Sequence, residues 1–600
     1  MATEQEDRGA AQVHWLVAGQ FGLGERGETL RLTRGDFNEV LEKAGLSVEA
    51  EIDNAASGGS WRVKLEIGSL KSFTLKHVVG AVPELGELAK KADRVAKLSD
   101  PTVDQLKELV GEGPLLEAMK ALVAPEEAKE PEGDGGDGQA TGDVDAIFEK
   151  AEVAKPTAKS AIDMFVKSTT SAKKKAKPAA RQLRDLIEET VWGMAADVLR
   201  APEVEAVETA WRGLRFLVTE CPKDAQMEVI LLETDPEHLL EDLGARDRAD
   251  DIDEPDCIFV PFEYESTGPL AELAGLAEQE LIPVVTGAGP ALFGCEDYQS
   301  IPEAFEKLER ASNEDVPEWA QAWDELRLDE STRWLTAVTN RVALHGEGKG
   351  VAARTTFGSG VWAIAAMLAS SFRNTGGFAR IFGKAGSLRA PASHTIDRGS
   401  YKDTAAPTEA FYAINPSELL AKNGVLGLGS ARNSDTLALT KAPTVRGAKD
   451  AVPLPAQILT GRVVRFASWV KAQLPEGCDS KQANDIFVSA ASVFLFPGQE
   501  EAAHVRAATT NIEGEAHVVV RAVANPAIAS VPFEIAFPLP LGWGVPAPET
   551  SDEEAETPSE QAQREAGEVT EVKPDPKEGE DGGIASVGVG FDAGLGKKDE

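Results

Sequence analysis

Short apolar runs alternate with amphipathic segments between residues 227 and 286, and this alternation restricts the possible folds more than any other feature. Helical periodicity follows Asp235 and continues through Leu243, and a second helical pattern covers Pro269–Glu280. The apolar runs have the length of strands and are Met227–Glu233, Cys257–Phe262 and Leu281–Thr286. Strands that alternate with helices at these lengths form a parallel sheet. We therefore predict a parallel α/β layer in this part of the chain.

The segment Glu203–Val218, just before this layer, has the spacing of an amphipathic helix. Its apolar side chains recur at helical intervals and are Val204, Val207, Trp211, Leu214 and Leu217. We predict that this face packs into the core, with Trp211 as its largest side chain. Glu208 and Arg212 lie one turn apart with the acid first, which predicts an outward-facing ion pair worth a few tenths of a kcal/mol. The helix is therefore interpreted as structural and not catalytic.

The chain is strongly acidic. Its 600 residues carry a formal net charge of −39, and acids are concentrated in residues 125–143 and 549–600. Because phosphate binding needs clustered Lys and Arg, we expect no nucleic-acid partner. No apolar run approaches the roughly 18 residues of a membrane helix, and residues 1–9 lack the apolar core of a signal peptide. We expect a cytoplasmic protein with no membrane insertion.

Residues that could carry chemistry are scattered along the chain. The cysteines form no C-x-x-C pair, and the seven histidines form no i, i+4 pair. These spacings support neither a metal site nor a disulfide framework. We expect no catalytic residue, no cofactor and no metal.

Gly22–Gly27 reads G-L-G-E-R-G and formally matches the dinucleotide-binding motif G-x-G-x-x-G. That motif works only where a helix begins at the glycines, because the pyrophosphate binds helix N-terminal amides. Here Leu30 and Leu32 alternate with polar residues, which is strand periodicity. We predict a glycine-rich hairpin that joins strands Val13–Phe21 and Glu28–Thr33. A nucleotide-binding α/β enzyme that uses this loop is the alternative.

Composition and pattern divide the chain into five segments. A small α+β domain comes first, followed by an acidic linker that holds no apolar residue larger than alanine. A short helix with a lysine-rich linker comes next, and then a large multi-layer α/β domain with a β-rich end. The last segment is acidic and contains Pro and Gly, so we predict a disordered tail. In chain order the segments are 1–124, 125–143, 144–178, 179–546 and 547–600.

The β-rich end is predicted to contain four strands, and alternation is clearest at Val518, Val520, Phe533 and Ile535. The predicted strands are Asn484–Phe496, Ala503–Thr509, Gly514–Val523 and Pro532–Pro538. In the tail, Ile584–Phe591 is either a short linear motif or part of a featureless terminus.

Two stretches resemble the subunits of one assembly. Glu208 followed by Trp211-Arg212-Gly213-Leu214 resembles the signature of the large sheath subunit (TssC, or VipB) of the type VI secretion system. The order of that subunit's motifs continues through Trp319–His345, Val361–Phe372 and Pro407–Glu409. The chain before residue 125 resembles the small sheath subunit (TssB, or VipA), and the matching residues are Phe37, Val40, Phe73, Val79, Pro83, Leu85 and Leu88.

The resemblance implies a natural fusion of both subunits, with copies of the chain forming a contractile sheath around an Hcp-like inner tube on a baseplate. Contraction would be mechanical, so the chain would not be an enzyme. Thr74, Trp334 and Asn340 depart from the family pattern. A sheath-like scaffold that does not contract is therefore a further alternative.

The resemblance also implies two interaction sites beside the structural signature Glu208, Trp211, Arg212, Gly213 and Leu214. Family members exchange terminal strands between neighbouring protomers, which here points to Val13, Trp15, Val17, Val518, Val520, Phe533 and Ile535. A ClpV-type AAA+ ATPase grips a short helix of the large subunit in the family. The corresponding helix carries Val144, Ile147 and Phe148, and the alternative is that it packs on its own domain.

Overall fold

The computed structural model describes most of the chain between residues 13 and 543. The described ranges are 13–98, 101–123, 158, 179–223, 226–246, 253–311, 315–397, 401–449, 451–499 and 501–543. The predicted linker, the predicted tail, and the docking residues Val144, Ile147 and Phe148 lie outside them.

The chain forms two compact units. The first comprises Met1–Phe37, Gly213–Leu344 and Phe357–Glu600, and the second comprises Asn38–Arg212 and His345–Thr356. This division differs from the five segments drawn from composition, which stay a prediction. The mixture of α/β and α+β architecture that the sequence predicts is confirmed.

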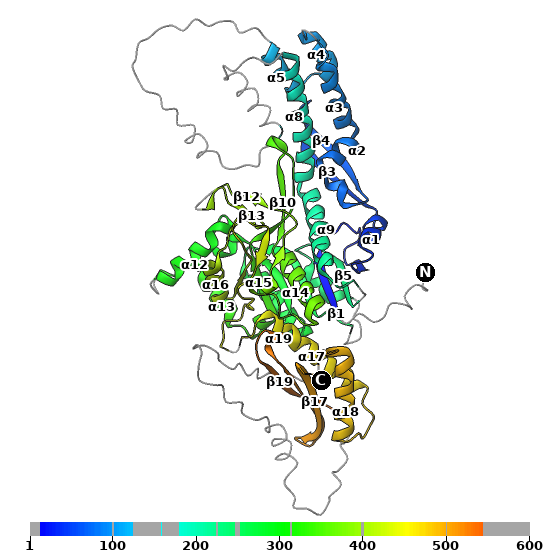
Figure 1. Cartoon of the computed structure of the whole chain (residues 1–600), viewed down its shortest axis with the longest axis vertical. Coiled ribbons are helices and arrows are strands. Elements are labelled where there is room, and N and C mark those ends of the chain that lie inside the picture. The colour runs from blue at the N-terminus through cyan, green and yellow to red at the C-terminus, as the bar shows by residue number, and fades with distance from the viewer. Residues whose placement is uncertain are drawn as a thin grey trace, which may run out of the picture. The chain divides into compact units, whose positions relative to one another are not determined.

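A seven-stranded sheet organises the first unit (Figure 1). In spatial order its strands are β14 (Val425–Gly427), β8 (Leu335–Thr339), β7 (Val284–Ala288), β6 (Cys257–Tyr264), β1 (Val13–Gly19), β5 (Met227–Glu233) and β2 (Thr29–Leu32). Every neighbouring pair is parallel except β2 with β5. The predicted parallel α/β layer is therefore confirmed, and its almost continuously apolar strands fit burial on both faces.

The predicted hairpin at Gly22–Gly27 is wrong. β2 is a strand, as its alternation predicts, but β5 lies between β1 and β2 in the sheet. β1 pairs with β5 in parallel, and β2 pairs with the other edge of β5. A sequence pattern identifies a strand but not its partner, because partner choice depends on tertiary packing.

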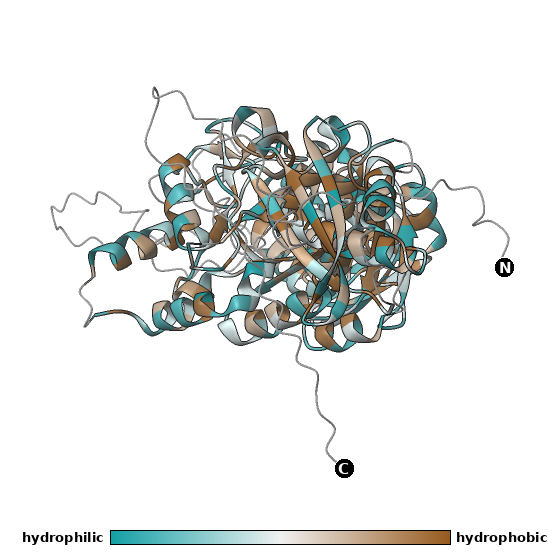
Figure 2. Ribbon diagram, turned by 90° about the horizontal axis from the view of Figure 1, so that it is seen from below, coloured by the Kyte–Doolittle hydropathy of each residue, from teal (hydrophilic) through white to brown (hydrophobic). Residues whose placement is uncertain are grey.

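Helices pack on this sheet through their apolar faces. One core cluster joins side chains from the strands to Leu239 and Leu243 of α10, Leu270 and Leu273 of α11, and Phe305 of α12. Figure 2 shows brown, apolar stretches along the strands and alternating brown and teal stretches on helices. The helices of the first unit's layer are α10 (Leu239–Ala245), α11 (Thr267–Glu280), α12 (Ile301–Arg310), α13 (Glu318–Leu328), α14 (Val361–Thr375) and α16 (Ile414–Lys422).

The C-terminal part of the first unit is a three-stranded antiparallel sheet with its own core. The sheet order is β17 (Ala503–Ile512), β18 (Glu515–Ala524) and β19 (Phe533–Pro540). The helices α17 (Leu454–Ala472), α18 (Ser480–Ala490) and α19 (Pro526–Ala529) accompany it (Figure 1). The inward residues Val518, Val520, Phe533 and Ile535 are buried, so the predicted alternation is confirmed.

The strand predicted at Asn484–Phe496 is wrong, because this segment is α18 continued by a π-helical turn over Ala491–Leu495. Ala483 and Phe487 are four residues apart and face the core. A capping box joins Asp479 to Gln482 and begins the helix. The composition of a short apolar run does not distinguish a helix from a strand. Here the helical spacing of the buried residues and the N-terminal cap favour a helix.

The second unit combines a hairpin with helices. Strands β3 (Leu46–Asp53) and β4 (Ser60–Ile67) pair in antiparallel register, and β3 was not predicted. The helices are α1 (Phe37–Lys43), α2 (Leu75–Ala81), α3 (Pro83–Val95), α4 (Val103–Val110), α5 (Pro114–Val123), α8 (Ala179–Arg200) and α9 (Pro202–Glu220). α2, α3 and α5 contact α8. α1, α9 and the pair β9 (Arg341–Glu347) and β10 (Arg354–Ser359) contribute residues to both units.

The remaining elements are short. They are β11 (Leu388–Arg389), β12 (His394–Thr395), β13 (Ala405–Ala406), β15 (Gly429–Ser430), β16 (Thr436–Ala438), α15 (Gly383–Gly386), and the 3-10 turns Leu70–Phe73, Pro290–Phe293, Tyr298–Ser300, Glu330–Trp334 and Gly350–Ala352.

Candidate functional site

A buried ion cluster lies in the second unit, centred on Glu208 of α9. The Glu208 side chain is 0% exposed. Its Oε1 accepts hydrogen bonds from Arg212 Nε at 2.5 Å and from Arg354 at 2.9 Å, and its Oε2 accepts from Arg354 at 2.6 Å. The predicted pair of Glu208 with Arg212 is therefore present. Its outward placement is wrong, because a second arginine from β10 makes burial of the carboxylate possible.

The two arginines of this cluster also bind the backbone near residue 73. The Phe73 carbonyl accepts from Arg212 at 3.0 Å and from Arg354 at 2.9 Å. The Glu347 carboxylate accepts hydrogen bonds from Arg354 Nε at 3.0 Å and from the Leu75 amide at 3.2 Å. The cluster therefore ties together segments that lie more than a hundred residues apart in sequence.

Charge is retained within the cluster despite burial. Burial lowers the pKa of Arg354, but the contacts with Glu208 and Glu347 outweigh it and the net shift is upward. Burial raises the pKa of Glu347, but His345, Arg354 and the Leu75 amide outweigh it and the net shift is downward. The pair of Arg354 with Glu347 is therefore ionised at neutral pH. The sequence offered no signal for Arg354 or Glu347, because neither lies at helical spacing from Glu208.

The rest of the structural signature fills the core. Trp211 and Leu214 are both 0% exposed, so the predicted core face of the helix is confirmed. Gly213 lies against the Trp362 ring, and a Cβ added at Gly213 would come within 2.3 Å of Trp362 Cδ2. Glycine at this position therefore permits a close approach of α9 to the indole ring of α14.

We expect Gly213→Ala to lower the free energy of unfolding by about 1–3 kcal/mol, because overpacking forces the ring or the helix to move. Alanine normally stabilises a helix interior by about 1 kcal/mol relative to glycine. Urea unfolding measures the difference. Gly275→Ala in α11 is the matched control, since an added Cβ there meets nothing within 4 Å and should stabilise. Equal effects of the two substitutions would contradict the close approach.

The predicted strand-exchange residues lie in three strands, β1, β18 and β19. Val13, Trp15 and Val17 are 0% exposed in β1, which pairs with β5 on one side and β6 on the other. Val518 and Val520 lie in β18, the middle strand of its sheet. Phe533 and Ile535 lie in β19, which has β18 as its single neighbour among the described strands. The exchange role of these residues stays a prediction.

The glycine-rich loop after β1 holds a carboxylate of the chain itself. Glu233 Oε2 accepts hydrogen bonds from the Phe21 amide at 2.9 Å and the Leu23 amide at 3.0 Å. Burial raises the pKa of Glu233, and these amides partly offset that rise. The next element is β2, so no helix N-terminus begins at the glycines. The geometry that a dinucleotide site needs is not formed at this loop.

The cysteines have the environment of core residues. All four are free, and three of them are buried. Burial raises the pKa of Cys221 to about 12 and the pKa of Cys295 to about 11, so both thiols are protonated at neutral pH. Among the described residues, no three His, Cys, Asp or Glu side chains lie close enough together to hold a metal ion. No helix within the described ranges is long and apolar enough to cross a membrane.

Two sequence families match separate parts of the chain. Residues 22–113 match the family described as "Type VI secretion system, VipA, VC_A0107 or Hcp2". Residues 263–446 match "EvpB/VC_A0108, tail sheath N-terminal domain", or VipB. One chain thus carries a VipA-like segment followed by a VipB-like segment, and the predicted resemblance to both sheath subunits is confirmed.

A curated relative and several solved structures are similar to the chain. The type VI secretion system sheath protein TssC1 of Pseudomonas aeruginosa is 22% identical over 294 residues, which is 42% of this chain and 58% of that protein. The PVC sheath complex of an extracellular contractile injection system, in the contracted state, aligns over 59% of this chain and 81% of its own at 10% identity and TM-score 0.32. The anti-feeding prophage baseplate aligns over 58% and 81%, at 11% identity and TM-score 0.30.

Proposed function

We propose that this chain, in which a VipA-like segment precedes a VipB-like one, is the structural protomer of a contractile sheath in a type VI secretion or related contractile injection system. The Glu208 cluster is the observation that carries the proposal. Phe73 and Leu75 of the VipA-like segment bind Arg354 and Glu347 of the VipB-like segment. Part of each segment therefore folds into the same compact unit, as we expect if the two act as one sheath protomer.

The proposed mechanism is mechanical and needs no catalytic residue. Copies of the chain would polymerise in an extended lattice around an Hcp-like inner tube on a baseplate, and relaxation of the lattice would propel the tube. A ClpV-type ATPase that grips Val144, Ile147 and Phe148 would supply hydrolysis when the sheath is recycled. Such a sheath would assemble in the cytoplasm. The occupied amides of the glycine-rich loop argue against the nucleotide-binding alternative.

We propose β19 as the strand that links protomers. Pro538 and Pro540 have no amide hydrogen, so in the ladder their nitrogens face away from β18. The amides of Glu534 and Ala536 also point away from β18, because the amides of successive residues in an antiparallel strand point alternately toward and away from the paired strand. The outer edge of β19 can therefore offer the amides of Glu534 and Ala536 to a strand from a neighbouring copy.

Negative-stain microscopy of the purified chain tests the proposed function. We expect tubes from the unmodified chain, and shorter, wider tubes when the lattice contracts. Tubes of one fixed diameter would favour the scaffold that does not contract. Monodisperse particles, together with a thermal shift on addition of NAD or ATP, would overturn the sheath proposal in favour of the enzyme.

The same preparation tests the linking strand through Ala536→Pro. We expect this substitution to abolish tubes and to leave soluble, folded protein, because it removes an outward amide and no bond to β18. Ala536→Ser keeps the amide and is the matched control, which should form tubes. Normal tubes from Ala536→Pro would rule out β19 as the linking edge and leave the sheath function itself intact.

A further inference from the structure

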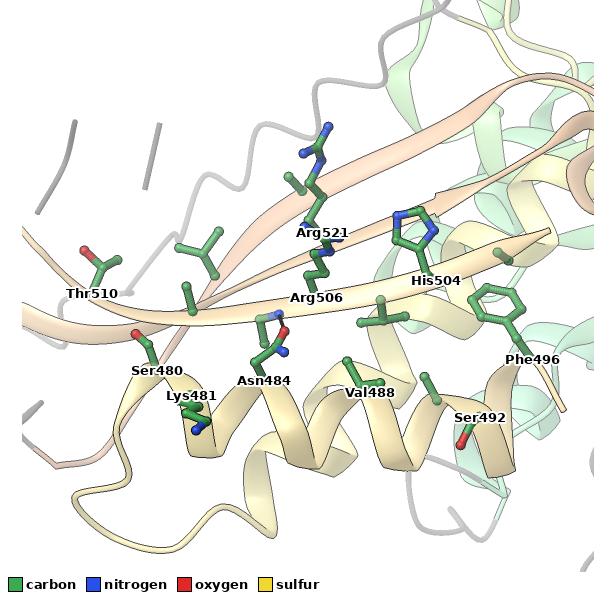
Figure 3. A pocket seen from close by; sticks show the side chains of 17 residues that line it. Ser480, Lys481, Asn484, Val488, Ser492, Phe496, His504, Arg506, Thr510 and Arg521 are labelled. Carbon is green, nitrogen blue, oxygen red and sulfur yellow. Dashed lines mark hydrogen bonds between the residues drawn. The ribbon is translucent and has the colours of Figure 1, made fainter. Parts of the chain in front are cut away.

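A groove of about 880 Å³ runs between α18 and the sheet that begins with β17 (Figure 3). Ser480, Asn484 and Val488 line it from α18, and Arg506 and Arg521 line it from the strands (Figure 3). The groove lies entirely within the first unit. Its lining residues come from successive positions of a helix and of a strand, which a peptide in extended conformation can follow.

Two side chains of α18, Ser480 and Asn484, form hydrogen bonds with the backbone at the edge of β17. Ser480 Oγ accepts from the Thr509 amide at 2.9 Å and donates to the Thr509 carbonyl at 3.1 Å. Asn484 Oδ1 accepts from the Ala507 amide at 3.2 Å. These contacts occupy outward backbone groups of Ala507 and Thr509, so an occupant beside these two residues would bind through side chains. Val488, which is 45% exposed, offers it an apolar surface.

Positive charge collects along the groove in an otherwise acidic chain. Lys481 and Arg506 line it and form no ion pair with any described residue. Arg521 also lines it and pairs with Glu534 at 2.8 Å. Partial burial, together with the charges of Arg506 and Arg521, lowers the pKa of His504. In a chain with net charge −39, this surface is suited to an acidic ligand.

The chain itself contains a segment of matching chemistry beyond its last described residue. Ile584–Phe591 reads I-A-S-V-G-V-G-F, in which Val587, Val589 and Phe591 alternate with small residues as in a strand. Acids stand on both sides of the segment, and they are Glu578, Glu580, Asp581 and Asp592. The apolar side chains of this segment match the apolar surface of the groove. The acids on both sides of the segment match the basic side chains that line it.

The length of the tail allows this segment to reach the groove. The described chain ends at Trp543, just after Leu541 donates its amide to the Ala516 carbonyl of β18 at 2.7 Å. About 40 residues follow before Ile584, and the root-mean-square end-to-end distance of a random coil of that length is roughly 35 Å. Crossing the three strands from β19 to β17 takes about 10 Å. We propose that residues 584–591 dock in the groove between α18 and β17 of the same chain.

Photo-cross-linking in the full chain tests this docking. Benzoylphenylalanine replaces Val488, and mass spectrometry identifies the captured peptide. We expect capture of residues 584–591 within one chain, as shown by mixing isotopically light and heavy protein. The same probe at Ile414, which is 66% exposed and does not line the groove, is the control and should not capture this segment. Capture of another segment, or none, would overturn the proposal, and capture between chains would replace it with docking of a second copy's tail.

Variants of both partners separate apolar contact from charge. Val589→Asp with Phe591→Asp should reduce the cross-link yield at least ten-fold, and Arg506→Glu should reduce it several-fold. Val569→Asp with Val572→Asp introduces two aspartates elsewhere in the tail and should leave the yield unchanged. Circular dichroism checks the fold of each variant. Equal loss from both tail pairs would overturn the assignment to residues 584–591. The result does not depend on whether the protein forms tubes.

Discussion

Replacing Glu208 by glutamine is expected to lower the free energy of unfolding by about 3–5 kcal/mol. The substitution removes the carboxylate that Arg212 and Arg354 share, and both guanidinium groups stay largely buried. Glu347 and the Phe73 carbonyl still bind these arginines, but the buried cluster then carries one positive charge that no carboxylate balances. Urea unfolding of the full chain, followed by tryptophan fluorescence, measures the loss.

Glu203→Gln is the matched control for this prediction. Glu203 lies in the first turn of the same helix and is exposed, so its removal should cost at most about 1 kcal/mol through the helix dipole. Glu208→Leu combined with Arg354→Leu should cost less than the sum of the two single changes, because it removes both charges of the pair. A loss below about 1 kcal/mol for Glu208→Gln would mean that water reaches the cluster.

Replacing Trp15 by alanine is expected to destabilise the first unit by about 3–5 kcal/mol. Trp15 is 0% exposed in β1, and its ring centroid lies 4.9 Å from that of Phe259 and 6.4 Å from that of Phe378. The change leaves a large cavity beside the central strands of the sheet. The loss should appear as a lower urea midpoint and as faster hydrogen exchange in β1, β5 and β6.

Trp15→Phe separates lost packing from lost hydrogen bonding. The Trp15 Nε1 group is buried and has no hydrogen-bond partner in the described part of the chain, so phenylalanine removes no bond. We expect a loss below about 1.5 kcal/mol for this substitution. Trp192→Ala, at a tryptophan that is 38% exposed, should change stability by less than Trp15→Ala. If Trp15→Ala leaves the first unit as stable as before, β1 does not belong to its core.

The patterns of longest range in the sequence were the most reliable. Alternation from Met227 to Thr286 predicted parallel strands, and helical spacing around Trp211 predicted a buried face, and both are confirmed. These patterns repeat over several turns or strands, so each residue supports the same conclusion. Asn484–Phe496 failed because its apolar run is compatible with either period, and the helix follows from its cap and from the core that Phe487 meets.

Partner choice could not be predicted for the groups that matter most to the proposed function. Glu208 pairs with Arg212, as its spacing of four residues indicates, but Arg354 is 146 residues away. No local pattern connects residues at that distance, so the sequence could not show that the carboxylate is buried. The sequence also could not predict that the Phe73 carbonyl binds both arginines, because every residue has a backbone carbonyl.

The sequence by itself determined the kinds of element, the parallel layer and the likeness to two sheath subunits, because periodicity and motif order are properties of the linear chain and do not depend on which segments meet. Only the tertiary structure decided that β1 lies between β5 and β6, that β19 keeps an outer edge, and that Arg354 binds both Glu208 and the Phe73 carbonyl. Those features depend on which surfaces meet after folding. Burial beside Arg354 makes an ordinary ion pair on a helix part of a cluster that also includes residues of the VipA-like and VipB-like segments.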